Sequence, residues 1–141
     1  MKKIFLSLVL ALSLAALNAQ THKTYHNCRE VLDSTLLTSP YVKDLILPWE
    51  KQIKANGGLG WDYVLDASPV FSDQDPLSGN AYNTDYIFLL RATYKDSAAP
   101  VYTFKVKPGT GKLFELDKAT NSWIQRKSDA ALMPILVSLC K

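Results

Sequence analysis

The chain has 141 residues, including 16 Lys or Arg, 13 Asp or Glu, two His and two Cys. This length supports one hydrophobic core but not two, and a hydrophobic content of 48% excludes a disordered chain. The formal net charge is +3 with both signs interspersed. A nucleic-acid binder, which needs a clustered basic surface, is therefore not expected.

The first 19 residues have the pattern of a bacterial secretory signal peptide. Two lysines precede an apolar stretch over residues 4–17, and Ala19 stands before the expected cleavage point. The stretch is short for a membrane span, although an uncleaved anchor is the rival interpretation. Cleavage would leave 122 residues with a net charge of +1, since Lys2 and Lys3 are removed. We expect a periplasmic or secreted protein with no membrane span after cleavage.

Cys28 and Cys140 are expected to form a structural disulfide that closes almost the whole mature chain. An even pair of cysteines in an exported protein usually forms such a bond. The alternatives are a redox pair and a nucleophilic cysteine. A redox pair usually has the Cys-x-x-Cys spacing, which is absent, and both histidines, His22 and His26, lie in the polar stretch ahead of Cys28.

A long amphipathic helix is predicted from Ser39-Pro40, an N-cap followed by a proline in the first turn. Asn56-Gly57-Gly58 ends it. Pro48 lies inside the pattern and should kink the helix, unless a new helix begins there. The apolar stripe consists of Val42, Leu45, Ile46, Trp49 and Ile53, at helical spacing.

The hydrophobic period then changes from 3.6 to 2, which is typical of half-buried strands. Strands are predicted over 61–66, 86–94, 101–107 and 113–117, with a short one beginning at Trp123 and a turn over 95–100. A final helix either starts from a Ser128-Asp129 cap or begins its regular part near Pro134.

This order predicts an α+β fold, with an N-terminal amphipathic helix packed on an antiparallel meander of four to five strands and a short C-terminal helix. The expected divisions are a signal peptide (1–19), an N-terminal tail with a short helical lead-in (20–38) and a single α+β domain (39–141).

No catalytic residues, metal or cofactor are predicted. His22, His26 and Cys28 are read as a solvated tail rather than a copper or nickel site, and the acidic loop around Asp73 and Asp75 lacks the spacing of an EF-hand. No histidine lies in the folded part, so catalysis by a histidine general base is not expected.

Three aromatic residues are candidates for a partner-binding surface, because Trp and Tyr are enriched at interfaces. Trp61 and Tyr63 lie in the first predicted strand, and Tyr82 follows in the polar 68–83 loop. The alternative is that these rings pack in the core, as aromatic strand residues commonly do.

The segment from Tyr102 to Leu113, with its Thr-Gly-Lys turn between apolar strands, resembles the hairpin of PepSY-like domains. The order of helix before sheet is also similar to a cystatin-type fold, although the cystatin motif Gln-x-Val-x-Gly is missing. The PepSY-like resemblance implies a non-enzymatic, exported module that binds or inhibits a protein.

We therefore expect a small exported, non-catalytic binding module that recognises an unidentified protein or peptide. One alternative is a small-ligand carrier or enzyme with a pocket between helix and sheet. The other is an immunity-type or structural envelope protein.

Overall fold

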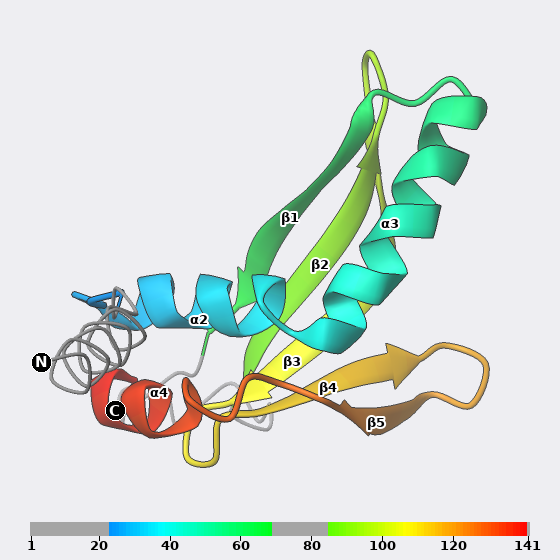
Figure 1. Ribbon diagram of the computed structural model, residues 1–141. Coiled ribbons are helices and arrows are strands. Elements are labelled where there is room, and N and C mark those ends of the chain that lie inside the picture. Colours follow the sequence, from blue (N-terminus) through cyan, green and yellow to red (C-terminus); the bar gives the residue numbers. More distant parts are fainter. Residues whose placement is uncertain (1–22, 69–84, 141) are drawn as a thin grey trace, which may run out of the picture.

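The computed structural model describes residues 23–68 and 85–140. Within these ranges it has three helices and a five-stranded antiparallel sheet, which confirms the predicted α+β class (Figure 1). The predicted signal peptide and nearly all of the 68–83 loop lie outside the described residues. The elements in chain order are α2 (Cys28–Leu37), α3 (Pro40–Ala55), β1 (Gly60–Ala67), β2 (Tyr86–Thr93), β3 (Ala98–Lys107), β4 (Lys112–Asp117), β5 (Ser122–Arg126) and α4 (Met133–Leu139).

Helix α3 begins and ends where its sequence predicts. Ser39 Oγ accepts a hydrogen bond from the Val42 N–H at 3.3 Å, and Pro40 stands in the first turn. Asn56 caps the C-terminus, and Gly57 follows at φ 79°, a left-handed conformation that glycine adopts without steric cost.

The apolar stripe of α3 faces the sheet, with Val42, Trp49 and Ile53 buried. The helix continues through Pro48 as one element and does not restart there. The hydrogen bond that Pro48 cannot donate would go to the carbonyl of Asp44, an exposed residue that water can reach. One missing bond on the solvent side is therefore tolerated.

The sheet is a simple meander in the order β1-β2-β3-β4-β5, each strand antiparallel to its neighbours. Helix α3 lies along one of its faces (Figure 1). The alternation predicted from the sequence is confirmed on that face, where the buried strand residues include Tyr86, Phe88, Leu90 and Ala92 of β2 and Phe104 and Val106 of β3.

Strand β3 starts earlier than predicted, so the expected turn over 95–100 is wrong in its second half. Pro100 pairs with Arg91 and Tyr102 pairs with Leu90, which leaves Val101 as an extra residue in a β-bulge. Proline has no N–H to donate and is tolerated in a sheet at such irregular positions. The bulge allows the strand to continue past Pro100 to Ala98.

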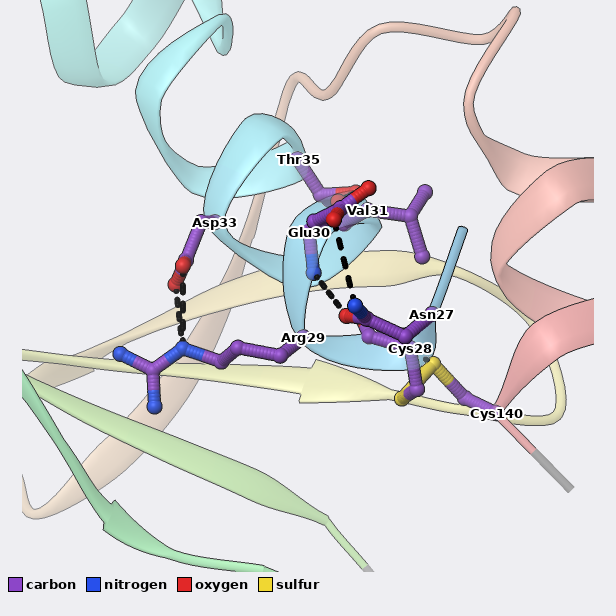
Figure 2. Close-up of polar contacts among 8 residues, drawn as sticks. All are labelled: Asn27, Cys28, Arg29, Glu30, Val31, Asp33, Thr35 and Cys140. Atoms are coloured by element: carbon purple, nitrogen blue, oxygen red, sulfur yellow. Dashed lines mark hydrogen bonds and ion pairs between the residues drawn. A yellow bond between two sulfur atoms is a disulfide. The ribbon is translucent and has the colours of Figure 1, made fainter. Parts of the chain in front are cut away.

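Helix α2 is longer than the helical turn or two that the sequence indicated. Asn27 Oδ1 accepts a hydrogen bond from the Glu30 N–H at 3.0 Å (Figure 2), and the Glu30 carboxylate accepts one from the His26 N–H at 2.9 Å. This reciprocal capping fixes the start of the helix. The buried apolar residues of α2 are Val31, Leu32 and Leu36, so the helix belongs to the same core as the sheet.

Helix α4 follows the second alternative for the C-terminal helix. Pro134 stands in its first turn, and the N-cap Leu132 makes no side-chain capping bond, so the Ser128-Asp129 cap is not used. The helix packs against α2 (Figure 1). The predicted disulfide is confirmed, since Cys28 at the start of α2 is bonded to Cys140 just after α4 (Figure 2).

We expect loss of the disulfide to destabilise the protein strongly. The bond closes a loop with a sequence separation of 112, and the chain-entropy model gives about 4–5 kcal/mol for a loop of this length. The measurement is urea unfolding of the oxidised wild type and of the Cys28→Ala, Cys140→Ala double variant, with the reduced wild type as a control. Unfolding free energies that agree within about 1 kcal/mol would contradict the prediction.

Candidate functional site

An apolar groove lies between the helices and the first strand. It has a volume of about 320 Å³ and is lined by Leu37 of α2, Lys43, Ile46 and Leu47 of α3, and Trp61 of β1. Leu47 is 66% exposed, and Leu59, two residues before Trp61, is 67% exposed. Leu59 does not line the groove. The exposed apolar side chain of Leu47 stands beside the apolar surface of Ile46 and Trp61 in the same groove, and apolar surface that gathers in one place marks interaction sites.

Trp61 is held in the groove by contacts with α3. Its ring centroid lies 6.5 Å from that of Trp49, which in turn packs edge-on against Tyr102 at 5.0 Å. Glu50, one residue further along α3, accepts a hydrogen bond from Lys54 Nζ at 2.6 Å. That bond lowers the pKa of Glu50, and the Trp61 indole contributes in the same direction. The indole is therefore fixed in place while part of it lines the groove.

The other two aromatic candidates do not line this groove in the described residues. Tyr63 packs against Phe88, with ring centroids 6.2 Å apart, and faces the Arg29–Asp33 ion pair of α2. Burial, followed by the charge of Asp33, raises the pKa of Tyr63. Tyr82 lies outside the described residues. The structure thus brings Trp61 to the groove and Tyr63 to the core, and the partner-binding role of each stays a prediction.

The groove adjoins an edge of the sheet, because Trp61 belongs to β1. In the described part of the chain, β1 pairs with β2 alone. An edge strand presents N–H and C=O groups that can pair with another chain. On the opposite face of the sheet, the Asp62 carboxylate accepts hydrogen bonds from Arg91 Nε and Nη2 at 2.8 and 2.6 Å, which lower its pKa. Asp62 and Arg91 therefore form a cross-strand ion pair.

A second feature, which we call the polar latch, consists of Tyr41, Glu115 and Arg126 and joins α3 to β4 and β5. Tyr41 Oη donates to Glu115 Oε2 at 2.6 Å, and Arg126 Nε donates to the same oxygen at 2.9 Å. Arg126 Nη2 forms an ion pair with that oxygen at 2.8 Å. The guanidinium carbon lies 4.3 Å from the Tyr41 ring centroid. Two hydrogen bonds and the charge of Arg126 thus compensate the burial of Glu115, which is only 8% exposed.

The chemistry of the latch is that of a fixed network. Burial and then the hydrogen bond to Glu115 raise the pKa of Tyr41 to about 12. At neutral pH the Tyr41 hydroxyl is therefore a hydrogen-bond donor rather than a base. A cleft of about 350 Å³ opens beside the latch, and Leu45, Tyr102, Asp117 and Ile124 also line it. No group of three or more His, Cys, Asp or Glu side chains that could hold a metal ion occurs among the described residues.

Comparisons with known proteins add no relative. Neither the family models, nor the curated proteins, nor the solved structures contain a match to this chain. Within residues 23–68 and 85–140, no helix is long and apolar enough to cross a membrane.

Sequence reasoning missed both the rest of the groove and the latch. One signal for the groove is present in the sequence, because Leu47 lies next to the apolar stripe of α3 but not on it, and a leucine at such a position is exposed to solvent. The latch gave no such signal. Tyr41 and Glu115 are 74 positions apart, and only the strand register brings Arg126 beside them.

The polar latch predicts that Tyr41 loses its proton at a higher pH than an ordinary tyrosine. Tyr41 ordinarily has a pKa of 10.0, and its folded pKa is about 12. The associated stability is therefore fully present below about pH 10 and is lost as the pH rises towards 12. The measurement is phenolate absorbance during an alkaline titration. In Tyr41→Phe the absorbance step of the tyrosine that titrates at the high pH should be missing. In Glu115→Gln the pKa of Tyr41 should fall.

The matched control is Tyr94→Phe, which removes a phenol at a 36% exposed site and should leave that absorbance step in place. Tyr41→Phe should also lower the free energy of unfolding at neutral pH by about 1–2 kcal/mol, since a hydrogen bond to a charged group is lost. An unchanged alkaline titration in Tyr41→Phe would show that the latch is not formed.

Proposed function

We propose that this protein is an exported, non-catalytic module that binds a partner polypeptide in extended conformation. The partner would add a strand to the edge of β1 and insert an apolar side chain into the groove lined by Leu47 and Trp61. The observation that carries the proposal is the position of an exposed apolar groove directly beside a sheet edge. Its resemblance to PepSY-like and cystatin-like domains stays a prediction.

Strand addition would use both surfaces described above, the edge of β1 and the apolar groove. Main-chain hydrogen bonds to an edge strand give affinity without regard to sequence, and a pocket for alternate side chains gives specificity. Burying one leucine-sized side chain in the groove would contribute about 1.5–3 kcal/mol. The groove has room for such a side chain, at about 320 Å³.

The cleft beside the polar latch supports a second candidate, a small-ligand carrier. Its volume of about 350 Å³ is that of a small-molecule site, and Tyr102 and Asp117 add polar groups to its wall. A ligand seated there would alter the alkaline titration of Tyr41 and leave the groove free. The enzyme alternative would use the same cleft. An immunity-type or structural envelope role also stays a prediction.

Peptide binding should depend on Leu47. A displayed library of random eight-residue peptides is selected on the wild-type protein, and the enriched peptides are synthesised for fluorescence anisotropy. Leu47→Asp should weaken their binding at least about tenfold, since it places a charge in an apolar contact. Because Leu47 is 66% exposed, the variant should unfold at the same urea concentration as the wild type.

The matched control is Val137→Asp, at a 39% exposed aliphatic position on α4, which should bind as the wild type does. Strand addition is tested separately by methylating the peptide's backbone nitrogens one at a time. Binding should fall at every second position, because alternate N–H groups of an added strand face β1. Peptides that bind Leu47→Asp as well as the wild type would refute the proposed site.

A further inference from the structure

Resting on the proposed function, we infer that the groove selects extended segments in which an acidic residue stands two positions before a bulky apolar residue. The apolar side chain enters the groove beside Leu47 and Trp61. The carboxylate pairs with Lys43 at the rim.

Lys43 is the cation in the lining of the groove. The charged pairs on the neighbouring helix surfaces are internally neutralised, since Arg29 Nε lies 2.8 Å from Asp33 and Lys54 Nζ lies 2.6 Å from Glu50. Lys43 makes no ion pair with the described residues. Its aliphatic stem can therefore extend the apolar wall while its ammonium group presents a positive charge at the rim.

The spacing of Lys43 and Leu47 matches that of a strand. The two residues are four positions apart on α3, which corresponds to about 6 Å along the helix axis. Side chains on one face of an added strand recur every two residues, or about 7 Å. Two alternate residues of a partner strand can thus meet the lysine and the apolar part of the groove at the same time.

The direction follows from the chain path. Helix α3 and β1 are joined by a short turn and run in opposite directions (Figure 1), and the start of β1 lies against Trp49, so Lys43 lies further towards the end of β1. An antiparallel partner, the slightly more stable arrangement, runs from the end of β1 towards its start. It passes Lys43 first and Trp61 second, which places the acidic residue before the apolar one.

The test uses three synthetic eight-residue peptides built on one threonine-rich sequence. The first has Asp two positions before Leu, the second has Asn in place of that Asp, and the third has Asp two positions after Leu. All three are also measured on Lys51→Gln, which removes the lysine four positions past Leu47 on α3. The first should bind the wild-type protein about two- to fivefold more tightly than the other two, the range expected for a rim ion pair. The difference should disappear at 1 M salt, where exposed charges are screened.

Lys43→Glu should reverse the preference, so that a peptide with Lys in place of Asp binds more tightly than the first. Lys112→Glu is the control, because Lys112 is an exposed lysine of β4 that does not line the groove, and it should keep the wild-type preference. Binding that requires Leu47 but is the same with Asp or Asn in the peptide, and the same in Lys43→Glu, would overturn the inference. The proposed function would then still stand. If no peptide binds in a Leu47-dependent way, both fall.

Discussion

One helix has to cover a sheet that is wider than itself. A helix with its side chains is about 10–12 Å across, whereas five strands spaced about 4.8 Å apart span about 19 Å between the outer strand axes. Helix α3 lies along one face of the sheet, and α2 and α4 lie together at one end of the molecule (Figure 1). The two flanks of α3 are left as depressions, one beside β1 and one beside β4 and β5.

The two flanks of α3 are lined by chemically different side chains. On the β4–β5 side the Glu115 carboxylate receives two hydrogen bonds and an ion pair, which tie the hairpin to α3. On the β1 side the described residues show no buried ion pair between α3 and β1. Apart from Lys43, the wall consists of aliphatic and indole surface, with Leu47 in solvent. On the polar flank the buried polar groups bond to one another. On the apolar flank, apolar surface stays exposed, and covering it with a partner would be favourable because it removes that surface from water.

The fold could be predicted from the sequence because its signals are local. The stripe of α3, its Ser39-Pro40 start and the alternation from Tyr86 onward depend only on neighbours along the chain. The bulge at Val101 could not be predicted, because it depends on which residue of β2 lies opposite.

The groove and the polar latch were harder to predict than the helices and strands, because both depend on residues that are far apart in the sequence. Trp61 was identified as an exposed aromatic candidate, but its position in a groove depends on where α3 crosses the sheet. Tyr63 has the same character in the sequence and lies against Phe88 instead. The polar latch depends on the pairing of β4 with β5 and on the first turn of α3, which no spacing in the sequence records.

The groove is also a preformed site. Helix α3 is fixed near its start by a hydrogen bond from Ser39 Oγ to the Lys127 carbonyl at 2.6 Å and by the polar latch. Towards its end it is fixed by the packing of Trp49 on Tyr102. Leu47 lies between these anchors and is 66% exposed, so the packing that holds α3 on the sheet leaves this side chain in solvent. A partner that docks there has no helix to displace, and little of its binding free energy is spent on rearranging the protein.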